Sequence, residues 1–180
     1  MADSTQAPPR SRSSGFMKVG TDWTISGSTV TASGMLADER YALGARLMTA
    51  GRHSFKFTIE RVLYPDGHLF LGVAEATDDP FRARTWSFSP PTGNLYIGAE
   101  LNEHGAEQTT HLLKDALETL LDRQPGAVVQ VNVDMDARTL SFSVNGSEPV
   151  PAGVDLPKAG VRPWVFLYHE GDSVAMEFVT

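Results

Sequence analysis

The stretch Gly126–Val144 constrains the fold of this 180-residue chain more than any other feature. Its first half alternates valines with polar residues, and after a short polar turn Leu140 and Phe142 continue the alternation. A period of two places the apolar side chains on one face of an extended strand. Asn145-Gly146 follows at once, and both residues tolerate the positive φ that tight turns require. We therefore expect two antiparallel strands that share one apolar face.

The rest of the chain repeats this pattern. Strand-like segments at Ser54–Val62, at Leu69–Ala74 and around Trp86 are separated by turns rich in Gly, Pro and Asp. Leu69–Ala74 is apolar at nearly every position, which is typical of a strand buried on both faces. Strands at this spacing with turn residues between them predict an all-β sandwich of two antiparallel sheets.

One segment, Thr110–Arg123, departs from the strand pattern. Apolar residues recur there at helical spacing, with charged residues on the opposite side. The apolar stripe consists of Leu112, Leu113, Ala116, Leu117, Leu120 and Leu121. We expect an amphipathic helix near 110–123, inside a helical insertion spanning 102–125. This helix either packs on the sandwich as a lid or forms a dimer or partner contact through the stripe from Leu112 to Leu121.

Five pieces of sequence, in order, resemble the SPRY domain family. The string VNVDMDARTLSFSVNG, ending at Gly146, resembles the family's signature hairpin. The other four pieces are Gly51–Phe57, Leu71–Ala74, Thr85–Phe88 and Val161–Val165. Together they cover about Leu43 to Val179, with Phe55 where the family usually has Trp. The resemblance implies a bent, concanavalin-like two-sheet β-sandwich that takes part in protein–protein interaction and carries no catalysis.

Length and composition are compatible with a single domain, predicted for residues 16–180, because one core is commonly built from roughly 100 to 200 residues. Residues 1–15 are rich in Ser, Pro and Ala and are predicted to be a disordered tail. The chain has no cysteine, and its net charge of −7 disfavours a nucleic-acid partner. Its apolar runs are too short for a membrane helix. We therefore expect an intracellular, cytoplasmic protein without membrane contact.

Neither catalysis nor a cofactor is predicted. The chain lacks the Glu-x-Asp-x-x-Glu string of sandwich glycosidases and any Gly-x-Ser-x-Gly motif, and its histidines are scattered. Asn132, Asp134 and Asp136 share one strand face and could offer oxygen ligands to calcium, but no further carboxylate follows at ligand spacing. We expect a non-enzymatic protein with no cofactor and no bound metal.

The resemblance also implies a preformed shallow pocket, made by loops at one end of the sandwich, that takes a short segment of a partner. Aromatic and arginine side chains dominate the energetics of such interfaces. The predicted anchors are Phe81, Arg82, Tyr168 and His169. Further contacts predicted from the loops are Arg40, Tyr64, Asp66 and His68. The last hairpin turn reads Tyr-His-Glu-Gly here, where peptide-binding members often carry Trp-Gly, so the resemblance does not specify the ligand.

Two other functions stay open. A carbohydrate-binding sandwich of lectin type would need a concave face lined with exposed Trp, Asn and Asp, whereas alternation favours core positions for Trp23, Trp86 and Trp164. Self-association through the leucine stripe would produce a dimer. The favoured partner is a protein or peptide of unspecified identity, and a monomer is favoured over a dimer.

Overall fold

A computed structural model describes residues 15–17, 22–34, 41–63, 69–78, 83–90, 93–98, 107–111 and 126–179, with the backbone alone for 107–111. The strands in this part of the chain are β1 (Phe16–Met17), β2 (Trp23–Ser26), β3 (Thr29–Ala32), β4 (Tyr41–Gly44), β5 (Arg52–Arg61), β6 (Leu69–Glu75), β7 (Thr85–Ser89), β8 (Asn94–Gly98), β9 (Glu107–His111), β10 (Val128–Asp134), β11 (Thr139–Val144), β12 (Val150–Pro151), β13 (Val161–Leu167) and β14 (Ser173–Val179).

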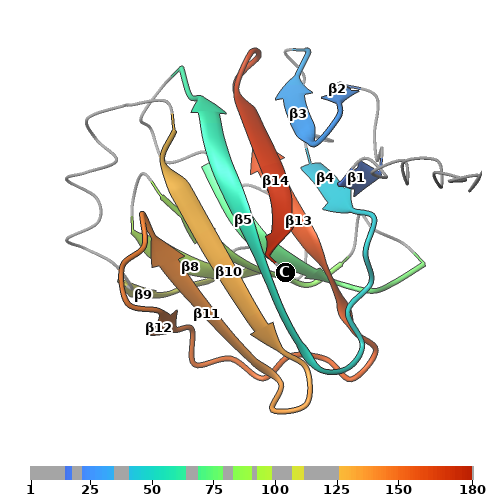
Figure 1. Ribbon diagram of the computed structural model, residues 1–180, viewed down its shortest axis with the longest axis vertical. Coiled ribbons are helices and arrows are strands. Elements are labelled where there is room, and N and C mark those ends of the chain that lie inside the picture. The colour runs from blue at the N-terminus through green and yellow to red at the C-terminus, as the bar shows by residue number, and fades with distance from the viewer. Residues whose placement is uncertain are drawn as a thin grey trace, which may run out of the picture.

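Within the described residues, these strands form two seven-stranded antiparallel sheets packed face to face (Figure 1). The first sheet has the order β1-β4-β13-β6-β7-β8-β9, and the second has the order β12-β11-β10-β5-β14-β3-β2. The predicted all-β antiparallel sandwich is confirmed. Within the same residues, no helix has the length and apolar character that crossing a membrane requires.

The alternating stretch that opened the sequence analysis forms β10 and β11. Val131 of β10 lies between Phe142 of β11 and Phe55 of β5, and all three side chains are fully buried. Phe142 contacts Phe88 of the other sheet, with ring centroids 5.6 Å apart. The apolar face of the hairpin therefore points into the core between the two sheets, as predicted.

The predicted turn at Asn145-Gly146 is also confirmed. These residues have φ values of 51° and 80°, in the left-handed region that Asn and Gly tolerate. The N–H of Ser147 donates to the carbonyl of Val144 across the turn at 2.9 Å. The turn leads the chain from β11 toward β12, which extends the edge of the second sheet.

The outer faces of the two sheets differ in chemistry. On the second sheet, Asn132 Oδ1 accepts hydrogen bonds from Ser54 Oγ at 2.7 Å and from Gln130 Nε2 at 2.9 Å. On the first sheet, side chains that alternate with core residues form an aromatic row, with successive ring centroids 6.4, 5.8 and 5.0 Å apart. The row runs through Trp164, Phe166, Phe70 and Tyr96. In the described part of the chain, the outer face of the second sheet is thus polar, whereas the outer face of the first sheet carries an aromatic row.

The structure corrects the start of the predicted helix. Thr110 and His111 belong to β9, whose backbone pairs with β8, so Glu107–His111 is a strand inside the predicted 102–125 helical insertion. The edge of β8 offers unpaired backbone groups, and consecutive β-branched threonines suit an extended strand. This pairing outweighs the helical periodicity at that point. The remainder of the predicted helix, 112–123, lies outside the described residues.

The strands that precede β5 are built into both sheets. β1 pairs with β4 and β4 with β13 in the first sheet, while β2 pairs with β3 and β3 with β14 in the second. Phe16 of β1 is buried in the core, and the carbonyl of Gly15 accepts a hydrogen bond from Ala45 N at 3.0 Å. The remainder of the predicted tail, residues 1–14, lies outside the described part of the chain.

Candidate interaction surface

Loops gather at two opposite ends of the sandwich (Figure 1). We name them the β13–β14 end, which carries the turn 168–172 at the top of Figure 1, and the β10–β11 end, which carries the turn 135–138 at the bottom. Strand β6 runs between them, from Leu69 opposite Leu167 to Glu75 opposite Val161. At about 3.3 Å per residue, a strand of this length separates the two ends by about 20 Å.

Two of the predicted loops are anchored at the β13–β14 end. Segment 64–68 connects Leu63 to the start of β6, which lies opposite the last residue of β13. Segment 35–40 leads into Tyr41, which pairs with Phe166 near the same end of β13. The predicted contacts on these segments lie outside the described residues; they are Arg40, Tyr64, Asp66 and His68.

Tyr168 and His169 are described and lie at this end as well, directly after β13. Their rings meet edge to face, with centroids 4.9 Å apart and an interplanar angle of 83°. Both side chains are half-buried, so part of each ring stays open to solvent. The described anchors of segments 35–40 and 64–68 therefore lie at the same end as the turn that carries Tyr168 and His169.

The loop that carries Phe81 and Arg82 is anchored at the opposite end. It leaves β6 after Glu75, whose N–H donates to the carbonyl of Arg84 at 2.8 Å where the chain returns. Phe81 and Arg82 themselves lie outside the described residues, but the described residues on both sides of them are at the β10–β11 end. The described anchors of this loop, Glu75 and Arg84, therefore lie at the end opposite to Tyr168.

A buried aspartate that the sequence reasoning missed joins three segments at the β13–β14 end. Asp172 is 1% exposed. Its Oδ1 accepts a hydrogen bond from Leu63 N at 2.8 Å, and its Oδ2 accepts one from His169 N at 3.3 Å. Its own carbonyl accepts from Ala32 N at 3.0 Å. The ends of β3 and β5 and the β13–β14 turn therefore meet at this residue.

Leu63 is a second residue of this surface that the sequence reasoning missed. Its side chain is 38% exposed. It lies beside the turn, because a Cβ placed on Gly171 would be 3.6 Å from Leu63 Cδ1. Gly171 has a φ of 87°, a conformation that glycine adopts without strain, and its lack of a side chain leaves the turn backbone open beside Leu63. An aliphatic side chain and two aromatic rings thus border one turn.

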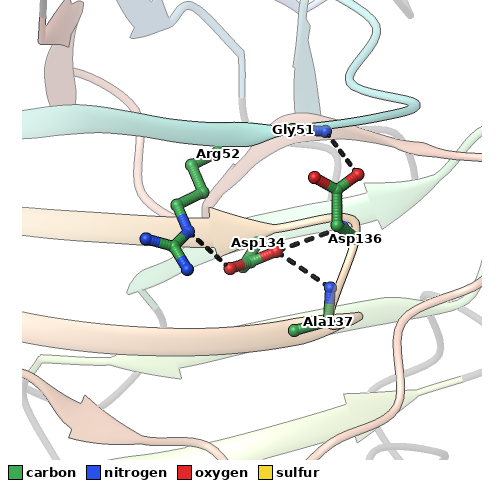
Figure 2. A network of polar contacts seen from close by, with 5 residues as sticks. All are labelled: Gly51, Arg52, Asp134, Asp136 and Ala137. Carbon is green, nitrogen blue, oxygen red and sulfur yellow. Dashed lines mark hydrogen bonds and ion pairs between the residues drawn. The ribbon is translucent and has the colours of Figure 1, made fainter.

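The β10–β11 end is held by two carboxylates, those of the half-buried Asp134 and the exposed Asp136 (Figure 2). Asp134 Oδ2 accepts from Arg52 Nε at 2.8 Å, and its Oδ1 accepts from the N–H groups of Ala137 at 2.9 Å and Asp136 at 3.1 Å. Asp136 Oδ1 in turn accepts from Gly51 N at 2.9 Å. The hydrogen bond from Ala137, followed by that from Arg52, lowers the pKa of Asp134 below its ordinary value.

These contacts occupy oxygens that could have served calcium. Asn132 Oδ1 accepts from two side chains, and the oxygens of Asp134 and Asp136 accept from the groups shown in Figure 2. In the described part of the chain, no group of three or more His, Cys, Asp or Glu residues has an arrangement that could hold a metal ion.

All three tryptophans are buried. Trp23 is 4% exposed and Trp86 is 1% exposed, which confirms their predicted burial, and Trp164, in the aromatic row on the outer face of the first sheet, is also only 4% exposed. A sugar-stacking platform requires an exposed aromatic face. The lectin hypothesis therefore loses the tryptophans on which it depended.

Comparison with protein families agrees with the fold. The sequence profile of the SPRY domain family matches residues 52–180. The chain belongs to the SPRY domain family. The predicted resemblance is confirmed, and the match begins at the first residue of β5. SPRY domains are generally protein-interaction modules and are typically non-catalytic.

Solved structures of SPRY domains are similar over most of the chain. The SPRY domain of human HERC1 is 25% identical with a TM-score of 0.64, covering 90% of this chain and 96% of that one. A human SPRY domain is 14% identical with a TM-score of 0.62, covering 91% and 97%. The PSpry domain of TRIM65 is 13% identical with a TM-score of 0.55, covering 87% and 85%. The last two likenesses concern the fold alone.

Proposed function

We propose that this SPRY domain is a non-enzymatic adaptor that binds a short segment of a partner protein at the β13–β14 end. The observation that carries the proposal is the meeting of three chain segments at Asp172, which places Leu63, Tyr168 and His169 around one turn. Strands hold these loops in place before binding, so little conformational entropy is lost when a partner segment docks.

The predicted contacts divide according to the end at which their loops are anchored. Arg40, Tyr64, Asp66 and His68 belong to loops of the β13–β14 end, and we propose them as further contacts of the same surface. Phe81 and Arg82 belong to a loop of the β10–β11 end, and we propose that they take no part in it. A cytoplasmic location and a monomeric state stay predictions from the sequence. Self-association through the leucine stripe stays a hypothesis, because those residues lie outside the described part of the chain.

The experiment that tests the function is selection of a phage-displayed library of random peptides on the immobilised full chain. Enriched peptides are then synthesised with a fluorescent label, and their Kd values are measured by fluorescence polarisation. The double variant Tyr168→Ala/His169→Ala should weaken binding by about tenfold or more, since buried aromatic contacts dominate such interfaces. The matched double variant Phe81→Ala/Arg82→Ala should change the Kd by less than about twofold.

The two double variants would show the reverse pattern of affinities if the binding surface lay at the β10–β11 end. Loss of affinity in the Phe81→Ala/Arg82→Ala protein, with none in the Tyr168→Ala/His169→Ala protein, would move the site to the β10–β11 end. Absence of any peptide enriched above the bare support would overturn peptide binding altogether. Thermal melts of all three proteins establish that they are equally folded.

A further inference from the structure

Asp172 differs from the other acidic and basic side chains in the described part of the chain, because it alone among them is buried. Removing a carboxylate from water is unfavourable unless hydrogen bonds compensate for the lost hydration. Here the compensating donors include two backbone N–H groups, on Leu63 and His169, from loops far apart in the sequence. The sandwich core needs no such group, since its strands already pair through their own backbones.

We infer that Asp172 is the positioning residue of the proposed interaction surface, fixing Leu63 relative to the turn that carries Tyr168 and His169. This inference rests on the proposed function. A carboxylate is rigid and planar, and each of its oxygens accepts from a different loop. The two N–H groups are therefore held at a set separation, and the side chains that border the turn keep their spacing.

The backbone of the same turn extends this arrangement to a third segment. Gly171 N donates to the carbonyl of Ala32 at 2.8 Å, and Ala32 N donates to the carbonyl of Asp172 at 3.0 Å. Asp172 N also donates to the carbonyl of His169 at 3.1 Å, which closes the turn. Ala32 is the last residue of β3, and the chain beyond it leads to the loop that contains Arg40. The turn is thus tied to both neighbouring loops of the β13–β14 end.

The first test needs no ligand. The variant Asp172→Asn keeps the size of the side chain but turns one acceptor oxygen into an NH₂ group, which cannot accept from a backbone N–H. Hydrogen exchange, followed residue by residue by NMR, should become about tenfold or more faster at the amide of Leu63 or at that of His169, whichever then faces the NH₂ group, as expected for the loss of one hydrogen bond. The amide of Met135, which donates to Gly51 at the other end, serves as the internal control and should not change.

The second test asks whether the spacing matters for binding. A labelled peptide selected on the wild-type chain should bind Asp172→Asn at least about tenfold more weakly at a temperature well below its Tm. The matched control is Val133→Ala, which truncates a core side chain at the β10–β11 end and lowers the Tm without touching the surface. Its affinity should equal that of the wild type, which separates positioning from a general loss of stability.

The outcomes distinguish the inference from the function on which it rests. Equal peptide affinity of Asp172→Asn and wild type would overturn the positioning role and leave the proposed function intact. Weakening by Val133→Ala to the same extent would also overturn it. If the wild type selects no peptide, the proposed function fails, and the exchange experiment alone decides whether Asp172 fixes the two loops. Unchanged exchange at Leu63 and His169 would then overturn the inference.

Discussion

Both ends of this sandwich are held by aspartates that accept backbone N–H groups, but the two ends place them in different surroundings. At the β10–β11 end, Asp134 and Asp136 each accept hydrogen bonds from backbone N–H groups near the surface. A backbone hydrogen bond from Met135 N to Gly51 O, 2.9 Å long, lies beside them. At the β13–β14 end Asp172, 1% exposed, accepts from the N–H of Leu63, which lies 109 positions earlier in the sequence. Water can replace a lost bond at the first end but not at the second.

The largest loss of stability is expected when Asp172 is replaced. Asp172→Ala removes the acceptor of two backbone N–H groups, and an unsatisfied buried donor costs about 1–3 kcal/mol. We expect the free energy of unfolding to fall by about 2–4 kcal/mol, measured by urea denaturation monitored by tryptophan fluorescence. A loss no greater than that of Asp136→Ala would remove the distinction between the two ends.

Asn145→Ala tests whether burial or position in the fold governs the loss of stability. Asn145 lies at the β13–β14 end, like Asp172, but is exposed. Its Oδ1 accepts from Val128 N at 2.9 Å, and its φ is 51°. We expect a loss of about 1–2 kcal/mol from the missing bond and the strained backbone. Asn145→Gly, which keeps the backbone freedom, should lose less. A loss from Asn145→Ala equal to that of Asp172→Ala would show that position in the fold, not burial, governs the difference.

Asp136→Ala tests the redundancy of the β10–β11 end. It deletes the hydrogen bond to Gly51 N, but the neighbouring bond from Met135 N to Gly51 O remains. We expect a loss of about 0.5–1 kcal/mol in the same urea experiment. A loss above about 2 kcal/mol would mean that this exposed contact is as costly to break as a buried one.

The smallest effect on stability is expected for Asp134, and it depends on pH. The pKa of this carboxyl is lowered from its ordinary value of 3.8 in the folded protein, so the group stabilises the fold above that pH. Its contribution is lost as the pH falls below 3.8 toward the folded-state pKa. Thermal melts should therefore show the Tm difference between wild type and Asp134→Asn greatest at neutral pH and shrinking in acid. A difference that is constant with pH would contradict the lowered pKa.

The sequence was sufficient to predict those parts of the fold that depend on neighbouring residues in the chain. The β10–β11 hairpin follows from side-chain alternation, and the turn at Asn145-Gly146 follows from the tolerance of those two residues for positive φ. The burial of Trp86 follows from its place in an alternating strand. Periodicity failed at Thr110 and His111, because pairing with the edge of β8 is a tertiary interaction that helical spacing does not reveal.

The candidate site could not be assembled from the sequence. Which loops share an end depends on the pairing of β6 with β13, strands that are far apart in the chain. For the same reason the loop containing Phe81 was grouped with Tyr168, although its described anchors lie at the other end. Asp172 gave no signal either, because a Gly-Asp pair in a turn is usually solvated, and its partner Leu63 N is 109 residues away.

The carboxylate of Asp172 accepts hydrogen bonds from backbone N–H groups, and every amino acid except proline supplies such a group. The side chains at positions 63 and 169 can therefore be changed without altering the hydrogen bonds that hold their loops. A combinatorial library that varies Leu63 and Tyr168–Glu170 while retaining Gly171 and Asp172 would present new side chains on an unchanged frame. This domain is accordingly suited to serve as a scaffold for engineered binding reagents.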